Sequence, residues 1–382
     1  MTPESLEMIK RLVGFNTISS ESNLNLINYV QEFLAQYGIN AVLVPNDSGT
    51  KANLFATIGP DTEGGVVLSG HTDVVPVEGQ PWSTDPFTAT LKNNRLYGRG
   101  TCDMKSFIAI ALAKVPSFLE AGLKKPIHLA LSYDEEVGCL GAPHLIEHLK
   151  NTIAKPQAVI VGEPTSMQVV TGHKGITTLK TQVTGHEAHS SQVQRGVSAV
   201  MTSAKLISYI QDLLDTNRCN ADSSSPFVPP YTTLHVGTIA GGTAVNIISR
   251  HCNFEWDIRN LPSDNWKYYL EKFESYANEL TSQMHKVAPD TGIKTNIMAN
   301  VPPLKHEISQ AAKLLFELLD CHKSNVVPFV SEAGQFQEQG FSVALCGPGS
   351  IDQAHQPDEY IEVSQVKACE QFMDKLAMKL AQ

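Results

Sequence analysis

Four short apolar segments each run directly into side chains that bind metal ions, and they constrain the fold of this 382-residue chain more than any other feature. The segments are Val66–Leu68 before His71 and Asp73, Ile127–Leu131 before Glu135 and Glu136, Ala158–Val161 before Glu163, and Val343–Cys346 before His355. Because helical patterns alternate with these strand-like runs, we predict a mainly parallel, helix-covered sheet. Ligand sites in open α/β sheets form at the carboxyl ends of the strands, so all four segments should converge on one edge.

The helical patterns lie before, between and after these strands. Apolar residues recur at helical spacing over residues 6–13, 24–37, 306–319 and 364–380. Met104 to Leu119 is predicted to be a single amphipathic helix that is stopped by Gly122.

The middle of the chain has a different rhythm of strand, helix, strand, strand, helix and strand. The predicted elements span residues 176–184, 196–215, 232–239, 252–258, 264–286 and 292–298. This is the order of a ferredoxin-like β-α-β-β-α-β unit. We therefore predict an α/β protein in which residues 1–176 plus 299–382 form one domain and residues 177–298 form an inserted second domain.

Composition and charge narrow the possible partners. A formal net charge of −10 and the lack of a Lys/Arg cluster disfavour a nucleic-acid surface. No apolar run approaches the roughly 20 residues that span a bilayer, and the N-terminus lacks the pattern of a secretory signal. The seven scattered cysteines form no CxxC pair, so we expect a cytoplasmic protein with reduced thiols and no membrane partner.

Two histidines and three acidic residues could together hold divalent ions such as zinc, cobalt or manganese. They are His71, Asp103, Glu136, Glu163 and His355. Each has an ordinary structural alternative, since a histidine after a strand is often a satisfied polar group and an aspartate at a helix start is often a cap. Their recurrence at the same structural position favours the metal site.

If Asp103 bridges two ions, each ion receives one histidine, one terminal carboxylate and one oxygen of Asp103. Such an arrangement leaves room for a shared water. Asp73 could accept the second imidazole N–H of His71 and fix its tautomer. Glu135 is then left beside the water, where a general base belongs.

Five segments resemble the metal-site motifs of the zinc aminoacylase and carboxypeptidase family. They are SGHTDVVP, GRGTCDMK, DEEVG, GEPT and AHQPDEY, in matching order and spacing over essentially the whole chain. The resemblance implies that His71, Asp103 and Glu163 hold one ion. Asp103, Glu136 and His355 would hold the other, with zinc as the expected metal. It also implies a cis peptide bond after Asp103.

The same resemblance assigns roles around the metal-binding domain. Glu135 would be the general base and then the acid, and residues 177–298 would be a lid through which the chain forms a homodimer. Asn246 and Arg259 match a substrate-binding Asn and an Arg that binds the free carboxylate, although Arg259 could instead form a salt bridge within the lid. His189 matches the residue that reaches the scissile carbonyl, in several members from the opposite subunit.

Within the family, residues 331–336 and 347–360 are most similar to enzymes that hydrolyse N-acetyl-L-ornithine to ornithine and acetate in arginine synthesis. The expected partner is therefore a small N-acyl amino acid. Gly349 is predicted to bind the substrate, and Glu332 to meet its side-chain ammonium, with a solvated loop carboxylate as the alternative for Glu332.

Three other functions stay open. A desuccinylase or a small dipeptidase is the nearest alternative, and a metal-binding dimer without catalysis is the alternative from another class. The intact base and ligand positions argue against such a silent dimer.

Overall fold

The computed structural model describes all 382 residues, which divide into two compact units. The first unit comprises Met1–Gly172, Leu304–Val326 and Ser331–Gln382, and the second comprises His173–Pro303 and Val327–Val330. The main segment of the second unit extends a few residues beyond the predicted 177–298 at each end, and Val327–Val330 falls within the range predicted for the first domain. The large, mainly parallel sheet of one unit and the antiparallel sheet of the other confirm the predicted fold class.

The sheet of the first unit has eight strands in the order β1-β2-β6-β3-β7-β14-β8-β13. Their bounds are Ala41–Pro45 (β1), Ala52–Ile58 (β2), Val66–His71 (β3), Ile127–Ser132 (β6), Ala158–Val161 (β7), Val170–His173 (β8), Asn325–Val327 (β13) and Val343–Leu345 (β14). The central strands β6, β3, β7 and β14 are parallel, whereas β1, β2 and β8 pair antiparallel at the sides. The parallel strands are the four apolar segments singled out in the sequence, so their carboxyl ends share one edge.

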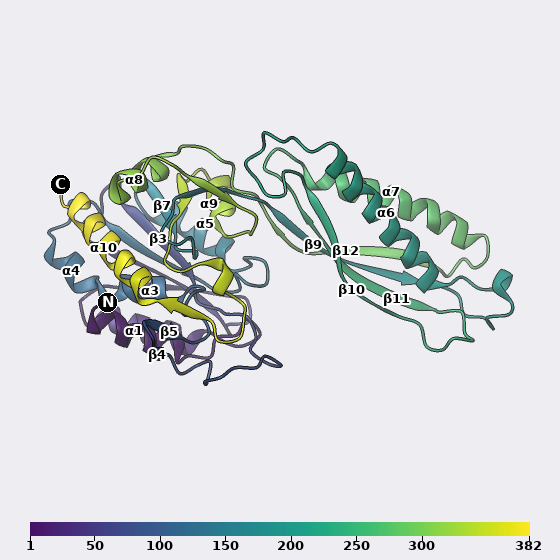
Figure 1. Ribbon diagram of the computed structural model, residues 1–382, viewed down its shortest axis with the longest axis horizontal. Coiled ribbons are helices and arrows are strands. Elements are labelled where there is room, and N and C mark those ends of the chain that lie inside the picture. Colours follow the sequence, from purple (N-terminus) through teal and green to yellow (C-terminus); the bar gives the residue numbers. More distant parts are fainter. The chain divides into compact units, whose positions relative to one another are not determined.

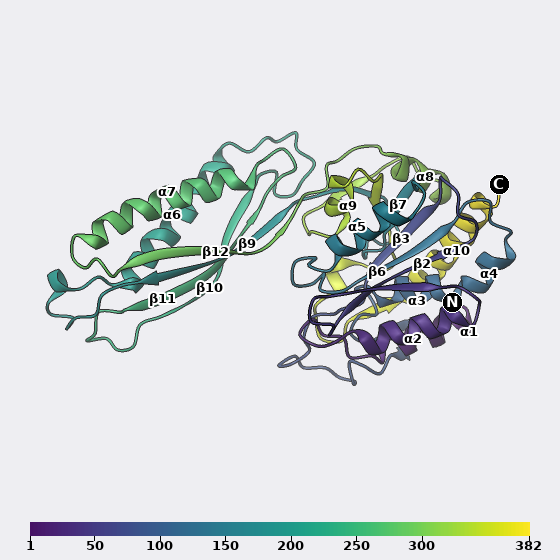
Figure 2. The same cartoon turned by 180° about the vertical axis from the view of Figure 1, so that it is seen from behind.

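Helices cover this sheet on both faces, with α5 and α9 on one side and α3 and α10 on the other (Figures 1 and 2). The helices of the first unit are Pro3–Val13 (α1), Leu24–Ala35 (α2), Lys105–Ala113 (α3), Val115–Glu120 (α4), Ala142–Thr152 (α5), Gln310–Leu319 (α8), Ala333–Glu338 (α9), Val363–Leu380 (α10) and the 3₁₀ turn Ile351–Gln353. A small sheet contains β4 (Thr90–Lys92), β5 (Arg95–Tyr97) and β15 (Tyr360–Glu362). No helix is both long enough and apolar enough to cross a membrane.

The single amphipathic helix predicted over residues 104–119 is wrong in two respects. The structure has two helices, α3 and α4, that meet at Lys114. Pro116 has no N–H to donate to the carbonyl four residues earlier, which ends the regular helix. Every residue from Lys105 to Leu112 is buried, so α3 has no polar face and packs inside the unit.

The second unit is a four-stranded antiparallel sheet in the order β10-β11-β9-β12. Its elements are Ile176–Thr184 (β9), the 3₁₀ turn Val193–Arg195, Ala199–Cys219 (α6), Thr233–Gly241 (β10), His251–Arg259 (β11), Trp266–His285 (α7) and Gly292–Val301 (β12). Alternate residues of β11 are buried, among them Phe254 and Trp256, and the Trp256 ring lies 4.7 Å from that of Phe273 on α7. Successive side chains of a strand point to opposite faces of the sheet, so the buried side chains of β11 share one face, and α7 packs against that face.

His128 on β6 is a buried histidine whose second ring nitrogen has no hydrogen-bond partner. Its Nδ1 lies 2.9 Å from Thr57 Oγ1, its ring stacks on Phe55 with centroids 5.8 Å apart, and its Nε2 is unpaired. Burial lowers the pKa of His128 to about 4. Because an unfolded histidine titrates near 6.5, the unfolded chain takes up a proton that the folded chain does not. Stability from this group is therefore complete above about pH 6.5 and is lost as the pH falls toward 4.

We expect His128→Phe to reduce the acid sensitivity of folding. Phenylalanine keeps the stacking on Phe55 but has no titratable nitrogen, and between pH 7 and pH 5 the parent should lose about 2 kcal/mol through this one group. Denaturant unfolding of both proteins at the two pH values measures the difference. Parallel losses of unfolding free energy in parent and variant would contradict the expectation.

Candidate metal centre

The shared edge of the parallel strands brings the five predicted ligands together. His71 ends β3, Glu136 follows β6, Glu163 follows β7, His355 follows β14, and Asp103 precedes α3. They form two groups, His71 with Asp103 and Glu163, and Asp103 with Glu136 and His355. Within each group the candidate ligand atoms all lie within 4.8 Å of one another. Asp103 is the one member that both groups share.

Asp103 directs one carboxylate oxygen toward each histidine. Its Oδ1 lies 3.0 Å from His71 Nε2, and its Oδ2 lies 3.4 Å from His355 Nε2. The peptide bond between Asp103 and Met104 is cis, as the motif resemblance implied. One carboxylate between two imidazoles is the arrangement that a bridging ligand requires.

Glu359 and Arg99 hold the loop that carries Asp103, and the sequence reasoning missed both. Glu359 Oε1 accepts the backbone N–H groups of Cys102 and Asp103 at 2.8 and 3.1 Å, and its Oε2 lies 2.6 Å from Arg99 Nη1. Both side chains of this ion pair are only 1% exposed. Glu359 and Arg99 occur inside the motifs AHQPDEY and GRGTCDMK, so the motifs contained a signal for them.

Asp73 differs from its predicted role. His71 Nδ1 lies 2.9 Å from the backbone carbonyl oxygen of Asp73 and 3.6 Å from its Oδ1, so the backbone carbonyl accepts the second N–H of His71. The carboxylate instead accepts the backbone N–H groups of Glu135 and Glu136, at 3.0 and 3.3 Å, and the Ser19 hydroxyl at 2.7 Å. Asp73 therefore connects His71, a predicted ligand, to the loop that carries Glu135, the predicted base.

The acidic residues of this site are crowded together and are buried or partly buried. Burial, with the neighbouring Glu136 and Asp103 carboxylates, raises the pKa of Glu135 to about 8, and burial with Asp103 raises that of Glu136 to about 7. Burial and Asp103 also raise the pKa of Glu163 well above its usual range, and Glu163 Oε1 has no hydrogen-bond partner. Buried carboxylates at such distances need cations for compensation, so the donor set fits two divalent ions.

Glu332 is neither a solvated loop carboxylate nor free to meet a substrate ammonium, which corrects both predictions for it. The residue is 1% exposed and precedes α9. Its Oε1 accepts the Ser69 hydroxyl at 2.5 Å, and its Oε2 accepts the Ser132 hydroxyl at 2.7 Å. Both oxygens are therefore engaged inside the first unit.

Gly349, predicted to contact the substrate, makes two backbone hydrogen bonds within the protein. Its N–H donates to Gln365 Oε1 at 3.2 Å, and its carbonyl accepts the Ser166 N–H at 2.6 Å. The backbone has a φ of +88°, and a Cβ at this position would lie 2.6 Å from Cys102 Sγ. Glycine is needed here for a close turn against the residue before Asp103.

Three further predicted residues, His189, Asn246 and Arg259, belong to the second unit. His189 and Asn246 are exposed, and His189 Nδ1 lies 2.8 Å from Ser191 Oγ. Arg259 ends β11, and its one ion pair is a long contact of 3.9 Å between its Nε and Asp257 Oδ1. The salt bridge considered as the alternative for Arg259 is therefore weak, because the contact exceeds hydrogen-bonding distance.

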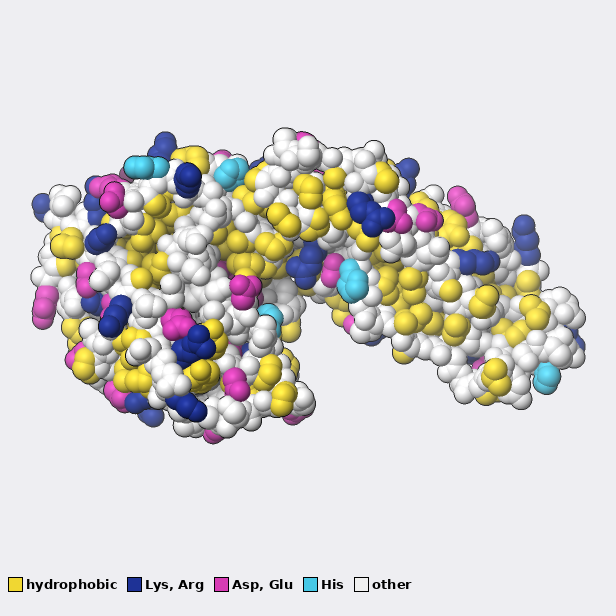
Figure 3. Space-filling model, in the orientation of Figure 1, with side chains coloured by type: hydrophobic (Ala, Val, Ile, Leu, Met, Phe, Trp, Pro, Cys, Tyr) yellow, Lys and Arg dark blue, Asp and Glu magenta, His cyan; other side chains and the backbone are white.

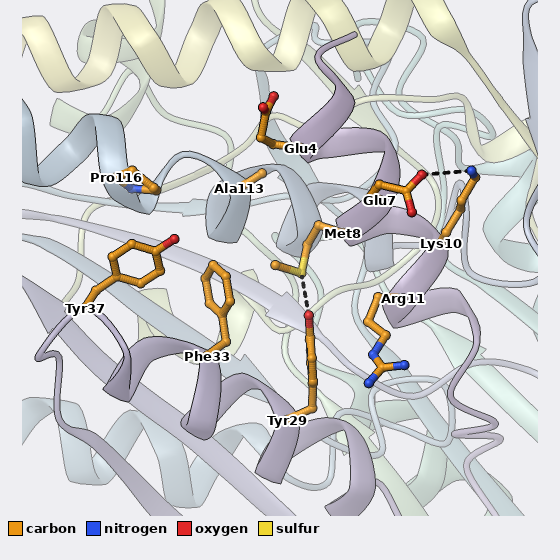
Figure 4. A pocket seen from close by; sticks show the side chains of 10 residues that line it. All are labelled: Glu4, Glu7, Met8, Lys10, Arg11, Tyr29, Phe33, Tyr37, Ala113 and Pro116. Carbon is orange, nitrogen blue, oxygen red and sulfur yellow. Dashed lines mark hydrogen bonds and ion pairs between the residues drawn. The ribbon is translucent and has the colours of Figure 1, made fainter.

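A separate groove of the first unit contains none of these residues. It is lined by α1, α2 and the junction of α3 with α4 (Figure 4). Glu7 pairs there with Lys10 at 2.9 Å, and the Arg11 guanidinium lies 4.9 Å from the centre of the Tyr29 ring. On the face shown in Figure 3, basic side chains are scattered among acidic ones.

The chain is similar to known proteins over nearly its whole length. The profile of peptidase family M20/M25/M40 matches residues 67–379. Acetylornithine deacetylase of Proteus mirabilis is 32% identical over 382 residues, which cover 98% of this chain and 96% of the relative.

Solved structures share the fold. An M20 family metallo-carboxypeptidase from Sulfolobus solfataricus has a TM-score of 0.79 at 17% identity, with all of both chains covered. Human carnosine dipeptidase 1 has a TM-score of 0.76 at 17% identity, with 99% of this chain and 97% of that chain covered.

Proposed function

Because the chain belongs to peptidase family M20/M25/M40 and is therefore an enzyme, we propose that it hydrolyses N-acetyl-L-ornithine to L-ornithine and acetate. The observation that carries this proposal is the 32% identity, across 98% of the chain, to the acetylornithine deacetylase of Proteus mirabilis. The product ornithine would serve arginine synthesis in the cytoplasm. All seven cysteines are free thiols, which suits a reducing compartment.

The two ligand groups would hold two divalent ions, with zinc as the expected metal and cobalt or manganese as alternatives. His71, Asp103 and Glu163 form the first group. Asp103, Glu136 and His355 form the second. Bound ions would polarise the amide carbonyl and lower the pKa of a water molecule.

The protein's own groups would then move the proton and orient the substrate. Glu135 belongs to neither ligand group, and its backbone is held by the Asp73 carboxylate at 3.0 Å. It would take the proton of the attacking water and return it to the leaving amine nitrogen. The second unit would supply His189 as a donor to the developing oxyanion, and Asn246 and Arg259 as contacts for the amino-acid part.

A direct assay separates this activity from its nearest alternatives. Acetate release from N-acetyl-L-ornithine is compared with succinate release from N-succinyl-diaminopimelate and with cleavage of a simple dipeptide, at equal enzyme and metal concentrations. We expect the acetyl substrate to have the highest kcat/KM. A higher value for the succinyl compound or the dipeptide would replace the proposed substrate with that one.

Arg259→Lys should lower kcat/KM for N-acetyl-L-ornithine by roughly one to two orders of magnitude. A guanidinium grips a carboxylate through two parallel hydrogen bonds, which an ammonium cannot reproduce, and such a charge-assisted contact is worth roughly 1.5 to 3 kcal/mol. N-acetylputrescine is the matched control, because it keeps the amide and the ammonium but lacks the α-carboxylate. Equal losses on both compounds would show that Arg259 serves the architecture of the second unit.

We also propose that the chain forms a homodimer through the second unit. Strand β10 lies at the edge of its sheet, and the exposed residues at its end and beyond include Ile239 at 53% and Val245 at 100%. An unpaired edge strand can pair with a second copy across a two-fold axis. Light scattering should give twice the mass of the chain. A fully active monomer at micromolar concentration would refute the dimer and any action of His189 from a neighbouring subunit.

A further inference from the structure

The segment that presents Glu135 and Glu136 is held at both of its ends, by Glu332 immediately before α9 and by Gln335 within α9. At the beginning of the segment, Ser132 donates its hydroxyl to Glu332 Oε2 at 2.7 Å. At its end, the carbonyl of Cys139 accepts Gln335 Nε2 at 3.2 Å. Glu332 and Gln335 are three residues apart, so they lie on one side of a helical turn. Neither residue belongs to a ligand group.

Cys139 extends this contact to the carboxylate of Glu135. Its Sγ lies 3.3 Å from Glu135 Oε1, and its backbone N–H donates to the Glu135 carbonyl at 2.9 Å. The Cys139 side chain is completely buried. Burial and the nearby Glu135 carboxylate raise the pKa of Cys139 well above its usual range, so the thiol stays protonated and can donate.

The other oxygen of Glu332 reaches the strand that ends in His71. Ser69, two residues before His71 on β3, donates its hydroxyl to Glu332 Oε1 at 2.5 Å. One buried carboxylate thus joins β3 to β6 beneath the predicted ligands. Breaking either hydrogen bond would leave a buried carboxylate oxygen without that partner, which is unfavourable in free energy. The two hydrogen bonds therefore hold both strands in place.

We propose that Cys139, Glu332 and Gln335 are positioning residues for the hydrolysis, which together hold the Glu135 carboxylate where the reaction needs it. The inference rests on the proposed function only for the role of Glu135. A displacement of a reacting group by about 1 Å can cost about a hundredfold in rate, so a contact that fixes Glu135 acts on kcat without touching the substrate.

Cys139→Ala and Gln335→Met remove the two hydrogen bonds at the end of the segment while keeping much of the buried volume. We expect each to lower kcat by about tenfold, with KM within about twofold of the parent and the bound metal unchanged. Cys139→Ser should recover most of the loss, because a hydroxyl can also donate to Glu135. Gln339→Met is the matched control, since Gln339 is exposed at the end of α9 and should leave kcat unchanged.

Hydrogen exchange over residues 132–141 reports the position of the segment without any turnover. We expect faster exchange there in Gln335→Met and in Glu332→Gln, with unchanged exchange in α7 of the second unit. Parent-like exchange over residues 132–141, or a parent-like kcat in both Cys139→Ala and Gln335→Met, would overturn the inference. If the parent hydrolyses no N-acyl amino acid, the proposed function fails, while the exchange experiment still decides whether α9 holds this segment.

Discussion

Glu135→Ala is expected to abolish turnover while leaving both metal ions bound. A general base contributes roughly 10²- to 10⁴-fold to rate, and kcat should fall by that factor. Glu135 is absent from both ligand groups, so its loss should spare metal binding. Metal analysis of the purified variant, beside its kcat, checks both parts of the expectation.

Two further variants sharpen this experiment. Glu135→Gln keeps the size of the side chain and should be as inactive as Glu135→Ala, because an amide cannot accept the proton. Glu147→Ala removes an exposed glutamate from α5 and should behave as the parent. Fewer metal ions in Glu135→Ala than in the parent would make Glu135 a ligand and would reopen the assignment of Glu136.

Asp103→Ala should remove both ions at once, because Asp103 is the one residue that both ligand groups share. Each ion contributes several kcal/mol of transition-state stabilisation, so losing both should lower kcat by about 10³-fold or more. Glu163→Ala is the matched comparison, since Glu163 occurs in one group and should cost one ion. The measurement is the number of ions per chain after dialysis against metal-free buffer. Two ions retained by Asp103→Ala would show that Asp103 does not bridge.

The local pattern of apolar residues was sufficient to predict the central strands of the first unit but not to predict α3 correctly. Apolar runs that alternate with helical segments predicted β3, β6, β7 and β14 as strands of one mainly parallel sheet, and their ladders are parallel as expected. The prediction of one helix over residues 104–119 was wrong because it assumed that the helix continues through Pro116 and leaves one face exposed. Whether a helix keeps a polar face depends on what packs against it, and α3 is covered on all sides.

The sequence by itself determined which residue types could form a metal centre and where along the chain they stand. It could do so because the carboxyl ends of parallel strands meet at one edge, whatever lies between the strands. His71 ends such a strand, and Glu136 and Glu163 each follow one, so the order of the strands along the chain and the handedness of their connections were enough to bring these side chains together.

Only the tertiary structure decided which polar groups support that centre. Glu332 is satisfied by Ser69 and Ser132, which are 263 and 200 residues away, and Glu359 pairs with Arg99 across 260 residues. A carboxylate in a loop has the same local sequence pattern whether water or buried hydroxyl groups surround it in the folded protein. Burial and hydrogen-bond partners are set by segments that meet only after folding, and for that reason Glu332 looked like a substrate contact in the sequence and is a buried link between two strands in the structure.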